Sequence, residues 1–111
     1  MTEFIDRKIT QAIENAAASF PVITITGPRQ SGKTTLARHM FPEYPYFSLE
    51  NPDVRNLAME DPVGFLNNTT EGIILDEVQN SPQLMSYIQG IVDNDYEKRF
   101  ILTGSNNFSM L

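Results

Sequence analysis

The chain has 111 residues, of which 41% are hydrophobic and 20% are charged, and its formal net charge is −6. This length suits one domain over residues 1–111, and the composition is that of a globular chain and not of a disordered one. The acidic balance, without any Lys/Arg cluster, argues against a nucleic-acid-binding face. The sequence contains no run of 18 or more apolar residues, so it predicts no membrane span. The lack of cysteine fits a reducing compartment, so we expect a cytoplasmic protein without a disulfide framework.

The first half of the chain predicts helix, strand, helix and strand in that order. Apolar residues at helical spacing predict an amphipathic helix over residues 5–19, which Pro21 ends. Residues 22–26 (VITIT) are β-branched and predict a strand. A glycine-containing loop follows, and a helix is expected over residues 33–40. Residues 44–49 (YPYFSL) predict a second strand, although it contains a proline.

The second half continues the same alternation. The pairs Asn-Pro at 51–52 and Asp-Pro at 61–62 each place a capping side chain before a proline, so we expect two short helices. Residues 72–76 (GIILD) predict a buried strand, Ser-Pro at 81–82 opens another helix, and residues 100–104 (FILTG) predict a fourth strand. This order predicts an α/β fold in three layers, α/β/α, with a mainly parallel sheet between the helices.

Residues 27–34, GPRQSGKT, match the phosphate-binding P-loop pattern G-x-x-x-x-G-K-[ST]. Gly27 and Gly32 permit the backbone angles and the close approach that a loop around phosphate needs. The helix that follows would point its N-terminal N–H groups at the anion. Lys33 can reach the β- and γ-phosphates, and the Thr34 hydroxyl can ligate Mg²⁺. The alternative is a glycine-rich surface turn with a solvated lysine, which the preceding strand and the following helix disfavour.

The candidate nucleotide-binding residues are those of this loop and of the start of the helix: Gly27, Pro28, Arg29, Gln30, Ser31, Gly32, Lys33, Thr34 and Thr35. Two of them have a second interpretation. Arg29 either contacts phosphate or is solvated, and Thr35 is either a ligand or an ordinary helix position.

Two acids end the third strand, at Asp76 and Glu77. We expect Asp76 to hold Mg²⁺ together with Thr34, because P-loop enzymes place a carboxylate opposite the loop hydroxyl. Glu77 should point to the other face of the strand end, polarise the attacking water and act as the base, with Lys33 assisting catalysis. The alternative is that the two acids have no catalytic role and lie at this strand end only because it is exposed to solvent. The pair lacks the D-x-x-G of GTPases, and nucleoside kinases generally lack the adjacent glutamate, so ATP hydrolysis is favoured.

The fourth strand ends in TGSNN, residues 103–107. In P-loop ATPases with an additional strand between the loop strand and the acidic strand, a polar side chain here orients the attacking water. Ser105 and Asn106 are both candidates, and Asn106 is preferred. The alternative is a turn rich in Gly, Ser and Asn.

Three segments together resemble the AAA-like ATPase domain of a large prokaryotic family whose chains usually continue into a C-terminal domain of unknown function. They are GPRQSGKTTL (27–36), LDEVQ (75–79) and TGSN (103–106). The resemblance covers about residue 7 to the end. It implies ATP and Mg²⁺ as ligands and a sheet of order 5-1-4-3-2. The fifth strand, the lid sensor, the arginine finger and the C-terminal domain would be missing, which leaves the order 1-4-3-2.

These features lead us to expect the N-terminal fragment of an AAA-like ATPase that drives a conformational change in the missing C-terminal domain. A nucleotide-dependent regulatory switch with slow hydrolysis and a small-molecule kinase are the alternatives. A homo-oligomer is a further expectation, because the resemblance favours a ring and the strand at 22–26 would be an exposed edge. These residues alone should have weak or no activity, because an arginine finger can contribute about 10³–10⁵ in rate.

Overall fold

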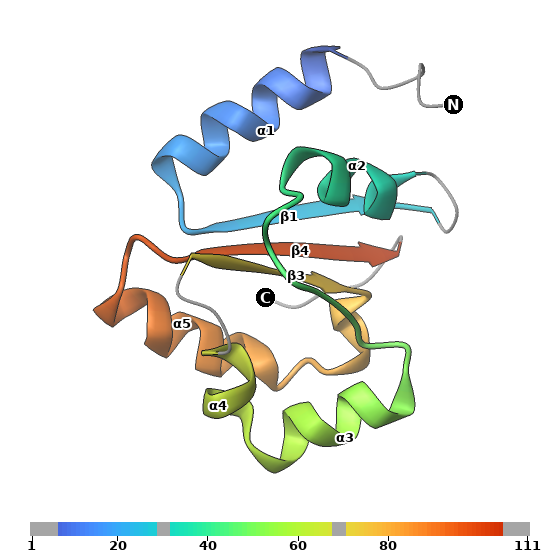
Figure 1. Cartoon of the computed structure of the whole chain (residues 1–111), viewed down its shortest axis with the longest axis vertical. Helices are drawn as coiled ribbons and strands as arrows, with labels where there is room; N and C mark the ends of the chain where they lie inside the picture. The colour runs from blue at the N-terminus through green and yellow to red at the C-terminus, as the bar shows by residue number, and fades with distance from the viewer. Residues whose placement is uncertain (1–6, 29–31, 68–70, 106–111) are drawn as a thin grey trace.

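The computed structural model describes residues 7–28, 32–67 and 71–105. Helices and strands alternate along the chain (Figure 1), in the order α1 (Arg7–Ser19), β1 (Val22–Gly27), α2 (Lys33–Met40), β2 (Tyr46–Ser48), α3 (Pro52–Glu60), α4 (Pro62–Leu66), β3 (Gly72–Asp76), the 3₁₀ helix η1 (Val78–Asn80), α5 (Leu84–Asn94) and β4 (Arg99–Ser105). The strands form one sheet of order β1-β4-β3-β2, in which every neighbouring pair is parallel. The predicted α/β class and the strand order 1-4-3-2 are confirmed.

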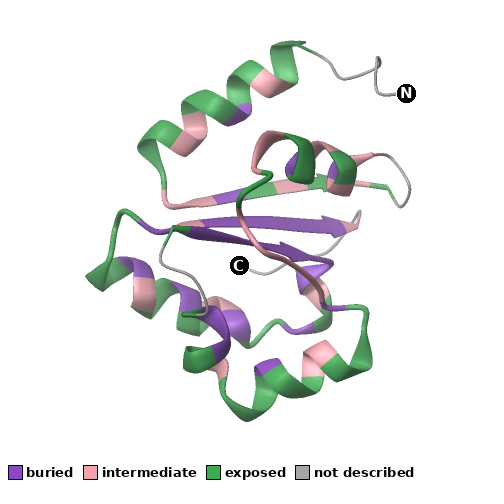
Figure 2. Cartoon of the chain, viewed as in Figure 1, coloured by how far each residue is buried: buried purple, intermediate pink, exposed green. Residues whose placement is uncertain are grey.

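Helices cover both faces of the sheet, which gives the three layers that the alternation predicts. α1 and α2 lie on one face, and α3, α4 and α5 lie on the other (Figure 1). The two central strands, β3 and β4, are buried along most of their length (Figure 2). Both faces of a parallel sheet are covered in this architecture, which is why residues 73–75 of β3 and 100–102 of β4 form uninterrupted apolar runs.

Side chains of the central strands alternate between two hydrophobic cores. On β3, Ile73 and Leu75 join the larger core beneath α3, α4 and α5, whereas Ile74 joins the smaller core beneath α1 and α2. On β4, Phe100 faces the larger core and Ile101 faces the smaller one. This alternation follows from the period of two in an extended chain, and it decides which polar side chains face α2 where the strands end.

The capping residues of the two short helices act as the sequence predicts. The Asn51 side chain accepts a hydrogen bond from the backbone N–H of Asp53 at 2.8 Å, and the Asp61 side chain accepts one from Gly64 at 3.1 Å. Each cap is followed by a proline at the first position of the helix. The chain therefore breaks into α3 and α4 at Asp61, as expected.

Two expectations about the elements need correction. The second strand is shorter than the predicted 44–49, because only Tyr46–Ser48 pair with β3. On α1 the apolar stripe is only partly covered: Ile13 is buried, but Ile9 remains 47% exposed, as does Phe20 just beyond the helix at 58%. The reason is that α1 packs over β1, which is one of the two edge strands of the described sheet (Figure 1).

Candidate functional site

Polar side chains meet where the strands end on the face that α2 covers. Asp76 lies two positions after Ile74, and Thr103 lies two positions after Ile101, so both face the same side as these core residues. Ser105 follows by the same spacing. Tyr46 pairs directly with Ile74 in the neighbouring strand and packs against the same core. The alternation of side chains along three parallel strands, β2, β3 and β4, thus gathers these groups near the start of α2.

The start of α2 carries no side-chain cap. Gly32 precedes the helix with φ 90° and ψ 5°, a left-handed conformation that favours glycine. Glycine has no side chain to occupy the N–H groups of the first turn, so these groups remain available at the positive end of the helix dipole. Lys33 is 6% exposed and donates a hydrogen bond to the Pro28 carbonyl oxygen at 3.4 Å. Thr35 lies on the exposed side of α2, and Gly27 is the last residue of β1. Arg29, Gln30 and Ser31 lie outside the described residues.

Asp76 receives hydroxyl hydrogen bonds from three separate elements. Thr34 of α2 donates to Asp76 Oδ1 at 2.8 Å, and Thr103 of β4 donates to the same oxygen. Tyr46 of β2 donates to Oδ2 at 2.8 Å. Burial is the main cause that raises the pKa of Tyr46, to about 12, and its hydrogen bond to Asp76 adds to the effect. The predicted pairing of Thr34 with Asp76 is therefore present, and two further hydroxyls hold the carboxylate.

Glu77 does not continue the alternation of β3, which corrects the expectation that it points to the other face of the strand end. The strand ends at Asp76, and Glu77 has φ 57° and ψ 54°, so the backbone turns in the left-handed region. Its N–H donates to the Thr103 hydroxyl at 3.2 Å. The turn brings the carboxylate back toward α2, where Oε2 lies 3.4 Å from Lys33 Nζ. Both acids consequently face the start of α2.

Three neighbours hold the Glu77 carboxylate in its ionised form. Gln79 donates to Oε1 at 2.6 Å, Ser105 donates to the same oxygen at 2.8 Å, and Lys33 forms the ion pair with Oε2. Burial by itself would raise the pKa of Glu77, but these two hydrogen bonds and the lysine charge together outweigh burial, so the pKa lies below its ordinary value.

The polar residue at the end of β4 that contacts the candidate base is Ser105. Asn106, the preferred candidate, lies outside the described residues. Sequence reasoning missed Tyr46, Thr103 and Gln79. Thr103 could have been found because it opens the TGSN segment at the same face as Ile101, whereas Tyr46 gives no local sign that it reaches Asp76.

The sequence profile of a family described as AAA domain matches residues 19–111. The chain belongs to this AAA domain family. It is accordingly a nucleotide-binding domain of the AAA type.

Two similar relatives are uncharacterized proteins of Mycobacterium bovis and Mycobacterium tuberculosis. Each is 38% identical over 106 residues, which cover 91% of this chain and 24% of the relative. The AAA domain described here thus spans about a quarter of the length of these relatives. The described residues include no helix with the length and the apolar composition that a membrane span requires.

The donor set of this AAA domain fits Mg²⁺. One hydroxyl, from Thr34, and one carboxylate, from Asp76, lie together at the start of α2. In the parts of the chain that the structure describes, no group of three or more His, Cys, Asp or Glu residues could hold a metal ion. Mg²⁺ is usually bound through one or two carboxylates, waters and the phosphates of the substrate rather than by a complete protein cage.

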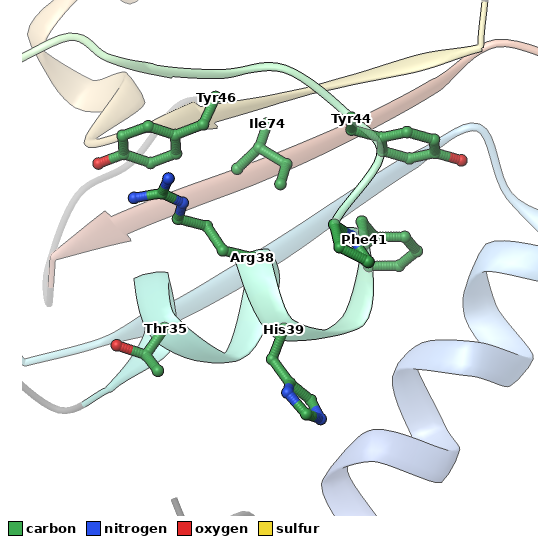
Figure 3. Close-up of a pocket in the computed structure, with 8 residues that line it drawn as sticks. Thr35, Arg38, His39, Phe41, Tyr44, Tyr46 and Ile74 are labelled. Carbon is green, nitrogen blue, oxygen red and sulfur yellow. The ribbon is translucent and has the colours of Figure 1, made fainter. Parts of the chain in front are cut away.

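An open cleft lies beside the site, between α2 and β2 (Figure 3). It is lined by Thr35, Arg38, His39, Phe41, Pro42, Tyr44, Tyr46 and Ile74. The guanidinium of Arg38 lies over the Tyr46 ring, 4.3 Å from its centroid. The cleft shares the Tyr46 side chain with the group of hydroxyls around Asp76, so β2 forms the boundary between the two.

Proposed function

We propose that this domain binds ATP with Mg²⁺ and hydrolyses it, and that the cycle drives a conformational change in a further domain of a longer protein. The observation that carries the proposal is a pair of contacts between α2 and the end of β3. Lys33 lies 3.4 Å from Glu77, and Thr34 lies 2.8 Å from Asp76. A phosphate-binding lysine, a metal-binding hydroxyl and two carboxylates are therefore held in one place.

Each of these groups has a role in the proposed reaction. Lys33 and the N–H groups of the first turn of α2 bind the β- and γ-phosphates. Thr34 and Asp76 would hold Mg²⁺, which neutralises charge on the phosphates when it is bound. Glu77 accepts a proton from the attacking water. The oxygen of that water bonds to the γ-phosphorus while the bond between the γ-phosphorus and ADP breaks. Ser105 orients the Glu77 carboxylate through its hydrogen bond to Oε1.

The ion pair supplies a link between binding and chemistry. Without nucleotide, Lys33 is the charge partner of Glu77. A triphosphate would compete for Lys33, because a multiply charged anion at the helix start is the stronger partner. Glu77 would then lose its cation while it keeps the hydrogen bonds from Gln79 and Ser105. Loss of the cation raises the basicity of the carboxylate at the moment when the substrate is present.

Calorimetric titration tests the binding half of this proposal. A non-hydrolysable ATP analogue with Mg²⁺ should bind the chain, and a GTP analogue measured alongside reports whether the base is selected. Lys33→Ala should reduce the affinity at least about tenfold, since it removes a charge-assisted contact to phosphate. Lys8→Ala removes a lysine from the exposed part of α1 and should leave the affinity unchanged. Equal affinities of both variants and the parent chain would refute the role of the loop.

A regulatory switch with slow hydrolysis is the second candidate, and the engaged state of Glu77 favours it. The carboxylate has three partners, all of which hold it ionised and in place. Glu77→Gln separates the two functions in the full-length protein. It should abolish hydrolysis in either case, but it should abolish biological function only if turnover is required. Phosphate transfer to an added small-molecule acceptor would instead indicate a kinase, which the adjacent acids disfavour.

A further inference from the structure

Tyr46 lies on β2, one of the two edge strands of the described sheet, yet its hydroxyl reaches Asp76 in the neighbouring strand. β2 pairs only with β3 among the described strands, and Tyr46 pairs with Ile74, two positions before Asp76. The Tyr46 hydroxyl donates to Asp76 Oδ2 at 2.8 Å. In Figure 3 the hydroxyls of Tyr46 and Tyr44 point in opposite directions, although both rings border the same cleft. Only the first of these hydroxyls is directed at the carboxylate.

The two oxygens of Asp76 are used differently. Oδ1 accepts from Thr34 and from Thr103, whereas Oδ2 accepts from Tyr46. Thr34 is the residue whose hydroxyl would be taken up by the metal, so its bond to Asp76 is the one that nucleotide binding would change. Thr103 and Tyr46 then remain, one on each oxygen. Two donors, one on each oxygen, fix the rotation of the Asp76 carboxylate about its Cβ–Cγ bond, which a single donor cannot do.

The ring of Tyr46 also has a contact of its own, with Arg38. Arg38 of α2 places its guanidinium 4.3 Å from the ring centroid (Figure 3). This is the distance and position of a cation–π contact. Arg38 lies one turn after Thr34 on the same helix. The helix that carries the metal-binding hydroxyl therefore also fixes the ring that orients the metal-binding carboxylate.

We propose that Tyr46 is a positioning residue that sets the Mg²⁺ affinity of the nucleotide complex through Asp76, and that Arg38 keeps its ring in place. The proposal rests on the proposed function, since it concerns the metal site of the same reaction. Groups that hydrogen-bond to a ligating carboxylate orient it, and their loss typically costs about 10–100-fold in metal affinity or activity. In this proposal Tyr46 acts on the metal only through its hydrogen bond to the Asp76 carboxylate.

The test measures metal dependence in the full-length protein rather than turnover. Affinity for a non-hydrolysable ATP analogue is measured by calorimetry in EDTA and at a series of Mg²⁺ concentrations. Tyr46→Phe should raise the half-saturating Mg²⁺ concentration about tenfold, and its affinity in EDTA should stay within about twofold of the parent. Tyr44→Phe is the matched control, because it deletes a hydroxyl from the same cleft, and it should change neither value. Arg38→Gln, at an exposed position, should shift the Mg²⁺ midpoint in the same direction by a smaller factor.

Each outcome decides the matter. A Tyr46→Phe midpoint within about twofold of the parent, or an equal loss of affinity with and without Mg²⁺, overturns the positioning role. If Tyr46→Phe melts at room temperature, Arg38→Gln carries the test, and an unchanged midpoint in that variant overturns the proposal. The proposed function fails if the parent protein binds the analogue equally well in EDTA and in Mg²⁺, or if it binds the analogue under neither condition. The role of Tyr46 then fails with it. A shift confined to the Tyr46 and Arg38 variants supports both.

Discussion

Glu77→Gln tests the site most directly, because it removes one charge from a buried ion pair without changing its size. Lys33 and Glu77 are 5% and 7% exposed at their side chains, and Nζ lies 3.4 Å from Oε2. The glutamine can still accept the hydrogen bonds from Gln79 and Ser105, which join Oε1 in the parent chain. The main loss is therefore the charge that faces Lys33.

The size of the effect follows from the geometry. At 3.4 Å and an effective dielectric constant of about 20, the Coulomb attraction is roughly 5 kcal/mol, from which the cost of desolvation is subtracted. Removal of one partner from a buried pair typically costs about 3–5 kcal/mol, and the retained hydrogen bonds of residue 77 place this variant near the lower value. We expect the free energy of unfolding without nucleotide to fall by about 3 kcal/mol, which lowers the melting temperature by more than about 10 °C in a domain of this size.

Nucleotide should reverse this loss. In the bound state Lys33 faces phosphate, so the missing charge of residue 77 no longer leaves the lysine unpaired. In the parent, the Glu77 carboxylate competes with phosphate for Lys33, and the variant lacks this competition. The variant should therefore bind an ATP analogue at least about tenfold more tightly than the parent, since about 1.4 kcal/mol corresponds to a factor of ten in affinity. The assay combines urea unfolding with and without the analogue and calorimetric titration. Glu97→Gln, an equal charge change at an exposed position, is the control.

The reasoning is refuted by two results. One is a nucleotide-free stability of Glu77→Gln within about 0.5 kcal/mol of Glu97→Gln, which is the usual range of a surface substitution. The other is weaker nucleotide binding by Glu77→Gln than by the parent, which would mean that the carboxylate does not compete with phosphate for Lys33.

Three further predictions concern stability. Thr103→Val removes the buried hydroxyl that joins Asp76 to the Glu77 N–H, so urea unfolding should show a loss of about 2–4 kcal/mol, whereas Thr103→Ser should lose about 1 kcal/mol. Lys98 is 2% exposed, and burial lowers its pKa below 10.5, so the unfolded chain holds this proton more tightly than the folded chain does. The free energy of unfolding contributed by Lys98 therefore rises with pH between its folded-state and unfolded-state pKa values. Any excess stability of Lys98→Met over the parent at pH 7.5 should shrink at pH 10, and a difference that stays constant with pH would contradict this. Asn51→Ala should cost about 1 kcal/mol in thermal unfolding through loss of the α3 cap, and no change would mean that the cap is not formed.

Much of the fold follows from local features of the sequence. The Asn-Pro and Asp-Pro pairs place the starts of α3 and α4, and the uninterrupted apolar runs place β3 and β4. These predictions succeed because a cap, a proline or a strand period depends on residues that are neighbours in the chain. The lengths of β2 and of the covered stripe on α1 could not be obtained in this way, because they depend on which strands lie at the edges of the sheet.

The sequence by itself determined the chemistry of the site: a glycine-bordered loop that ends in Lys33 and Thr34, and a strand that ends in Asp76 and Glu77. Only the tertiary structure decided how these groups meet. The left-handed turn at Glu77 returns its carboxylate to Lys33, and the strand register brings Tyr46 to Asp76 from 30 positions away. The physical reason is that such contacts depend on strand order, register and face. A slip of one residue would turn every side chain of a strand to the opposite side of the sheet.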